Sequence, residues 1–193
     1  MRSVLLANAL LAGAWQVAGA VEVEIHYAAL ERILAEQMFT QDGRKYVRGT
    51  PAARCNFAYL EHPDVRGEAG GRLHVKARFS GRSAWDVFGR CVGLGDSFDL
   101  EITAVPYFHD GAIRFRDVKV ESRKDGFYIR RVLAALTTTL RTQFAYKVAE
   151  DARRILEEKR GNYRQELKGF QVSSVRVTGD ALVLSLEFTL AVK

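Results

Sequence analysis

The sequence predicts an α+β fold in which a strongly curved antiparallel β-sheet wraps around one long amphipathic α-helix, with a short helix near the N-terminus. Residues 125–160 repeat apolar side chains at helical spacing, whereas several segments before and after them alternate apolar and polar residues as strands do. The last alternating segment, residues 182–192, is unusually long for a strand. A long helix and strands of comparable length favour a sheet that follows the helix axis.

The first twenty residues have the features of a secretory signal peptide. Arg2 precedes an apolar run, and Ala18-Gly19-Ala20 matches the small-x-small pattern of a cleavage site. The apolar run is short for a membrane span, although an uncleaved membrane anchor is the alternative interpretation. We therefore expect a mature chain of residues 21–193 that forms one domain, is soluble and reaches the periplasm.

The composition is that of an ordinary globular protein with a modest positive charge. Without Arg2 the chain has 28 basic and 23 acidic residues, a net charge of +5. This charge is compatible with transient contact with an anionic membrane surface. Export makes nucleic acid an improbable partner, and the sequence identifies no protein partner.

The two cysteines, Cys55 and Cys91, are expected to form a disulfide in an oxidising compartment. Closing a loop of about 37 residues should stabilise the fold by roughly 3 to 4 kcal/mol. Two separate buried thiols are the alternative.

The elements before the long helix are mostly strands. Residues 21–25 alternate as a short strand, and residues 27–39 have the spacing of a first helix of about three turns. Alternation then predicts strands at residues 54–60, 73–79 and 98–104, the last one disrupted at Pro106. Residues 80–97, rich in glycine, are interpreted as a long connection or a short strand pair. Asp110-Gly111 predicts a hairpin turn, and a change of parity near Arg116-Asp117 predicts a β-bulge in the returning strand.

The predicted long helix contains no proline, and its only glycine is Gly126 near the start. Its length would be roughly 50 Å, more than a compact domain with a radius of gyration of about 16 Å accommodates easily. Gly161-Asn162 is expected to end it. A run of three threonines, residues 137–139, weakens the helix; their hydroxyls could either bond to preceding carbonyls or line the polar end of a cavity. A terminal hairpin over residues 170–193 closes the chain.

No catalytic, metal-binding or nucleotide-binding motif occurs in the sequence. The four histidines, His26, His62, His74 and His109, lack the spacing of metal ligands, and the sequence has no GxSxG, SxxK, HExxH or P-loop pattern. We therefore expect a protein that is not an enzyme and needs no cofactor. A hydrolase of unrecognised type is the alternative, which a converging nucleophile, base and orienting group would reveal.

The order of these elements, with Gly111-Ala112-Ile113-Arg114-Phe115-Arg116-Asp117-Val118 after an apolar strand, resembles the bacterial members of the tubular lipid-binding (TULIP) superfamily, including small periplasmic lipoproteins. The chain departs from the lipoprotein members because no cysteine follows residues 18–20. The resemblance implies no catalytic residues and a lipid or other elongated apolar ligand held between helix and sheet. The candidate lining residues are Leu133, Leu136, Leu140, Phe144, Val148, Val75, Phe79, Leu100, Ile102, Phe115, Leu184, Leu186 and Phe188.

The same apolar pattern also fits a protein with a fully packed core. Such a protein would act in the cell envelope through protein partners, as a structural or assembly component. Periodicity alone does not separate a packed core from an empty slot, so both functions remain open at the level of the sequence.

Overall fold

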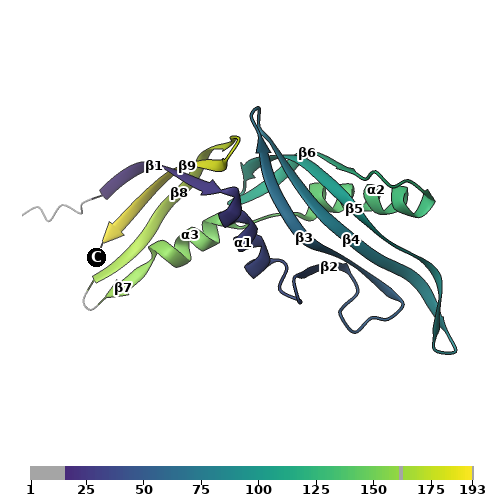
Figure 1. Ribbon diagram of the computed structural model, residues 1–193. Helices are drawn as coiled ribbons and strands as arrows, with labels where there is room; N and C mark the ends of the chain where they lie inside the picture. The colour runs from purple at the N-terminus through teal and green to yellow at the C-terminus, as the bar shows by residue number, and fades with distance from the viewer. Residues whose placement is uncertain (1–15, 161–162, 193) are drawn as a thin grey trace, which may run out of the picture.

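The computed structural model describes residues 16–160 and 163–192, which form two antiparallel sheets and three helices (Figure 1). The larger sheet has five strands in sequential order: β2 (Arg44–Arg48), β3 (Asn56–Glu68), β4 (Arg72–Val87), β5 (Arg90–His109) and β6 (Ala112–Glu121). The smaller sheet has four strands in the order β1 (Gln16–His26), β9 (Ala181–Val192), β8 (Tyr163–Val177) and β7 (Glu158–Arg160). Helix α1 (Tyr27–Gln37) lies between the two sheets in Figure 1.

The strands form where the sequence alternates, because one face of each strand packs in the core. In β5, Phe98, Leu100, Ile102 and Ala104 are buried, while the residues between them face outward or are half-buried. The five-stranded sheet curls, and helix α2 (Phe127–Gln143) packs against its last two strands, β5 and β6. Helix α3 (Val148–Leu156) packs against β8 of the other sheet.

The prediction of one long helix over residues 125–160 is wrong. The helix ends at Gln143, and Phe144 takes an extended conformation with φ −71° and ψ 122°. The backbone of Tyr146 then exchanges two hydrogen bonds with that of Ile113, with N–O distances of 2.8 and 2.9 Å. Two backbone hydrogen bonds to β6 replace helical ones here, and α3 starts only at Val148. The curled sheet therefore packs against α2, a helix of 17 residues, and the described residues contain no single long helix for it to wrap around.

The end of the predicted helix is also different. Residues 158–160 form β7 and pair with β8, so the helix does not continue to Arg160. The predicted stop at Gly161-Asn162 lies outside the described residues.

The β4–β5 hairpin is much longer than the sequence predicted. Residues 80–97 form neither a loose connection nor a separate short strand pair, because β4 and β5 pair without a register shift from Leu73↔Ala104 to Val87↔Arg90. Strand β5 also continues through Pro106, which is buried opposite Phe115. The expected disruption at Pro106 is therefore wrong.

Several local predictions are confirmed. The register of β5 and β6 shifts where Val105 pairs with Arg116 and Thr103 with Lys119, so β6 carries an extra residue at the bulge predicted near Arg116-Asp117. The last strand, β9, is 12 residues long. Cys55 and Cys91 form the expected disulfide, with their Cα atoms 5.3 Å apart.

Most of the predicted signal segment, residues 1–15, lies outside the described residues. Strand β1 begins at Gln16, so the last five residues of that segment pair with β9 here. In the described residues, no helix has both the length and the hydropathy to cross a membrane.

Candidate apolar binding site

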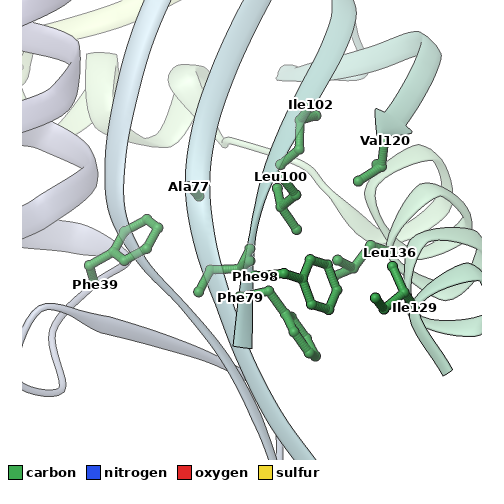
Figure 2. Packing of buried hydrophobic residues seen from close by; sticks show 10 residues of the cluster. Phe39, Ala77, Phe79, Phe98, Leu100, Ile102, Val120, Ile129 and Leu136 are labelled. Atoms are coloured by element: carbon green, nitrogen blue, oxygen red, sulfur yellow. The ribbon is translucent and has the colours of Figure 1, made fainter. Parts of the chain in front are cut away.

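Eleven of the thirteen predicted lining residues belong to, or pack against, one of two hydrophobic cores. One core, which we call the α2 core, joins the curled sheet to α2 and to Phe39, which lies two residues after the end of α1. Its buried members are Phe39, Leu60, Ala77, Phe79, Phe98, Leu100, Ile102, Val120, Ile129 and Leu136. Figure 2 shows Ile129 and Leu136 of α2 on one side, Phe39 on the other, and Ala77, Leu100 and Ile102 of the sheet between them in this view. The cluster contains four of the predicted lining residues: Phe79, Leu100, Ile102 and Leu136.

The other core, the junction core, joins the two sheets to the start of α1. Its buried members are Tyr27, Val65, Leu73, Ile113, Val172, Val177, Leu182 and Leu184. Of the predicted lining residues, Leu184 is buried in it, and Val148, Phe115 and Leu186 are half-buried against it. The long helix was expected to bring all these residues into one tube. Its interruption after Gln143 places them in two clusters.

Leu34 of α1 and Val75 of β4 connect the two cores. Both side chains are half-buried, and both pack against the α2 core as well as the junction core. Val75 pairs with Val65 of the junction core on one side and with Ile102 of the α2 core on the other. The two cores are therefore continuous through these two residues.

Other half-buried apolar residues pack against one or the other core. We call this set the apolar seam: Leu30, Leu34, Val75, Phe115, Leu133, Leu140 and Val148. Each packs against a core but keeps part of its surface accessible to solvent. An apolar molecule in contact with the seam would remove that surface from water, which is favourable by roughly 25 cal/mol per Å².

Phe144 was expected to face the ligand from the helix stripe. It stacks on Phe115 instead, with ring centroids 4.4 Å apart and planes 13° from parallel. Phe188 is half-buried in β9 and pairs with Phe170 of β8, and it belongs to neither core. Phe144 directly follows α2, but neither Phe144 nor Phe188 is a member of the α2 core.

Two of the three hydroxyls in the threonine run bond within the helix. Thr137 donates to the carbonyl of Leu133 at 2.8 Å, and Thr138 donates to that of Ala134 at 3.0 Å. This confirms the first interpretation for Thr137 and Thr138, whose hydroxyls are satisfied by the helix itself.

A shallow hollow of about 250 Å³ lies elsewhere on the larger sheet. Its lining consists of Phe57, Tyr59, Ser80, Gly81, Arg82, Gly95, Asp96 and Ser97. It is mainly polar, and it shares no residue with the predicted lining. Gly95, which lacks a side chain, leaves room for it, because a Cβ there would lie 3.4 Å from the Arg82 side chain.

Within residues 16–160 and 163–192, no group of three or more His, Cys, Asp and Glu side chains is placed to hold a metal ion. His74 lies on the outer face of β4, where Nδ1 is 2.9 Å from Glu101 Oε1 and Nε2 is 3.1 Å from Glu68 Oε2. The hydrogen bond with Glu101, followed by that with Glu68, raises the pKa of His74 above its usual value. His74 of β4 therefore links the two neighbouring strands on the sheet surface, because Glu68 is in β3 and Glu101 is in β5.

Sequence reasoning missed Leu34 as the link between the cores and Tyr27 as a buried residue of the junction. The hydroxyl of Tyr27 donates towards the carbonyls of Thr178 and Ala181, at 2.6 and 2.8 Å. Burial is the main cause that raises the pKa of Tyr27, and the charge of Asp180 adds to it. The partners follow Tyr27 by about 150 residues, so no local spacing in the sequence could have indicated them.

No protein-family model, curated protein or solved structure matches this chain.

Proposed function

We propose that this protein is an exported, non-enzymatic module that binds a lipid-like or other elongated apolar molecule along the apolar seam. The observation that carries the proposal is the continuity of the two cores through Leu34 and Val75. These two half-buried residues each pack against both cores. Large aliphatic side chains that pack against a core yet stay partly accessible form a surface suited to an apolar guest. A TULIP-like role in envelope lipid handling fits the same chemistry.

The seam includes residues of two helices, α1 and α2. Leu133 and Leu140 stand two turns apart on α2, a helix of 17 residues that spans about 25 Å. Leu30 and Leu34 stand one turn apart on α1. A chain-like apolar molecule that reached both helices would contact more of these residues than a compact one.

A second candidate function is that of an envelope assembly protein that acts through protein partners. The filled interior of the α2 core favours it, because Leu136, Phe79 and Leu100 are at most 5% exposed and contact protein. In this case the seam would be ordinary core periphery.

Ligand uptake distinguishes the two candidates. Protein purified without detergent would be examined by native mass spectrometry and titrated with a fluorescent fatty acid. The lipid-binding function predicts a co-purifying apolar molecule and saturable uptake. No bound molecule and no uptake would overturn it and leave the assembly function, which crosslinking to a recovered partner would then support.

Two variants assign the uptake to the seam. Leu34→Gln should weaken uptake by about tenfold, since it places an amide where both cores meet. Leu133→Gln on α2 provides a second seam variant if Leu34→Gln fails to fold. Ile155→Gln is the matched control, because Ile155 on α3 is 75% exposed and belongs to neither core. Equal uptake by the seam variants and the control would refute the assignment.

A further inference from the structure

The end of the β4–β5 hairpin is a two-stranded ribbon that projects beyond its sheet. The pairing of β3 with β4 reaches only Asn56↔Ser83, and that of β6 with β5 starts at Glu101↔Glu121. Among the described strands, residues 84–93 therefore pair only with each other. The tip lies at the lower right in Figure 1, away from the four-stranded sheet.

The ribbon carries its apolar residues on one face. Directly paired residues share a face, and successive residues alternate. Trp85 pairs with Val92, Ser83 with Leu94, and Val87 with Arg90. Five large apolar side chains are exposed here, four on this face and one at the turn: Trp85 (79%), Val87, Val92, Leu94 and Phe88 (103%). An apolar group of this size at a projecting tip marks an interaction surface.

The exposed face continues the sheet face that α2 covers. Phe79 and Phe98 are paired and buried beneath α2, and β4 and β5 keep their register from there to the turn. A Cβ on Gly81 would lie 3.0 Å from the hydroxyl of Tyr128, which is in the first turn of α2. The first turn of α2 lies beside Gly81, and the helix does not cover the strands between Gly81 and the hairpin turn. The same face is therefore accessible to solvent there.

The opposite face of the ribbon is held to the sheet. Cys91 is bonded to Cys55, and Asn56 Nδ2 donates to the carbonyl of Ala84 at 2.7 Å. Ala84 is buried, and its backbone N–H donates to the carbonyl of Cys55 at 3.0 Å. These contacts fix the direction in which the apolar face points.

The turn itself uses an unfavourable residue. Phe88 and Gly89 form a two-residue loop with φ values of 52° and 77°. Positive φ at both positions is typical of turns that prefer Asn-Gly, and a bulky side chain at the first position is rare. Folding alone would be better served by asparagine, so the exposed phenylalanine points to a role outside folding.

The charges around the tip complement an anionic surface. Arg54, Arg82 and Arg90 are exposed, and in the described part of the chain no ion pair involves them. The one acidic residue of the ribbon end, Asp86, accepts a hydrogen bond from the backbone N–H of Gly89 at 2.8 Å. Arg90 shares the apolar face and Arg82 lies on the opposite one, so basic side chains lie on both faces of the hairpin. Basic side chains close to exposed aromatic and aliphatic ones suit lipid phosphates above an acyl layer.

We propose that the β4–β5 tip docks this protein on an anionic phospholipid bilayer, with Phe88 and Trp85 inserted at the interface and Arg54, Arg82 and Arg90 against the headgroups. The tip is convex, and a bilayer accepts a convex apolar protrusion without a matching pocket. From Trp85 to Phe88 the ribbon extends about 10 Å, the depth to which interfacial segments insert. The proposal goes beyond ligand binding at the seam and does not depend on it.

Vesicle flotation tests the proposal. Phosphatidylcholine vesicles that contain phosphatidylglycerol should bind the protein, and pure phosphatidylcholine vesicles should bind it less. Phe88→Asn should reduce binding by about tenfold or more, because it removes a large apolar group from the tip while it suits the turn. Its thermal unfolding midpoint should be unchanged or raised, which a merely structural role of Phe88 does not predict.

Further variants separate charge from apolar insertion. Trp85→Ser should act like Phe88→Asn, whereas Arg90→Gln should weaken binding only to the anionic vesicles, by about fivefold. Ile155→Ser, which changes an exposed apolar residue on α3, should bind like the unaltered protein.

Absence of vesicle binding, or equal binding by Phe88→Asn and Ile155→Ser, would overturn the proposal. So would self-association that Phe88→Asn abolishes in a protein that ignores vesicles, since that would assign the tip to a second copy of the chain. Fatty-acid uptake by Phe88→Asn should be unchanged, so failure of docking and failure of ligand binding are distinguishable.

Discussion

Gly67 of β3 lies directly against the hydroxyl of Tyr27. A Cβ at Gly67 would lie 1.8 Å from Tyr27 Oη and 2.2 Å from the carbonyl oxygen of Thr178. The same hydroxyl donates towards the carbonyls of Thr178 and Ala181 in the β8–β9 hairpin. The absence of a side chain at Gly67 therefore allows α1 to join the two sheets at one point.

Gly67→Ala should destabilise the protein by about 2 to 3 kcal/mol, because backbone and the buried Tyr27 ring must both move. Urea unfolding followed by circular dichroism measures the loss. Gly169→Ala is the matched control, since a Cβ there would meet only the side chain of Thr189, at 3.9 Å. Similar midpoints for the two variants would show that the approach of Tyr27 to Gly67 is not tight in solution.

His74 should make the stability depend on pH. Its pKa is raised by Glu101 first and Glu68 second, so it lies above the unfolded value of about 6.5. A group whose folded pKa is raised stabilises the fold fully below its unfolded pKa, and the contribution is lost as the pH rises through the folded pKa. The stability lost in His74→Gln should therefore be larger at about pH 5 than at about pH 9.

An NMR titration of the His74 ring tests the cause. Glu101→Gln should lower the measured pKa of His74, because it removes the stronger of the two carboxylate contacts. An unchanged titration curve in Glu101→Gln would mean that the ion pair is absent in solution. Because both partners are partly exposed, added salt should reduce the effect.

Charged substitutions on α2 should distinguish the packed core from the seam. Leu136 is 5% exposed and Leu140, one turn further, is half-buried. Leu136→Asp should prevent folding, since a carboxylate would be buried without a partner. Leu140→Asp should fold with a loss of about 2 kcal/mol, because its carboxylate can reach water. Soluble yield and urea midpoints measure both effects, and equal damage by the two substitutions would contradict the assignment of Leu140 to the seam.

Local patterns in the sequence predicted the features that depend on neighbouring residues. Alternation identified the strands, the parity change near Arg116-Asp117 located the bulge, and export with two cysteines indicated the disulfide. The break in the long helix could not be predicted this way. Phe144 continues the helical stripe perfectly by spacing, but Phe115 and Ile113, about 30 residues earlier, hold residues 144–146 in an extended conformation. Tertiary contacts outweighed helix propensity there.

The glycines at positions 81, 89, 93 and 95 concealed the projecting ribbon for a different reason. Glycine usually marks loops, and the sequence therefore indicated a connection between residues 80 and 97. In the structure a Cβ at Gly93 would lie 2.5 Å from the Cα of Ala84, so this glycine permits close packing within the ribbon. The same residues that disguised the ribbon allow it to form.

Reduction of the Cys55–Cys91 disulfide should destabilise the protein by roughly 3 to 4 kcal/mol on the chain-entropy model, since the bridge closes a loop with a sequence separation of 36. Neither cysteine should react with iodoacetamide in the unreduced protein, because both sulfur atoms are in the disulfide. Both cysteines should react after reduction and unfolding. The double variant Cys55→Ala/Cys91→Ala should show the lower urea midpoint of the reduced protein, and reductant should not lower it further.

The bridge also fixes the ribbon, so this variant should bind anionic vesicles more weakly even under conditions where it is folded. Full vesicle binding by the folded variant would mean that residues 84–93 keep their direction without the bridge.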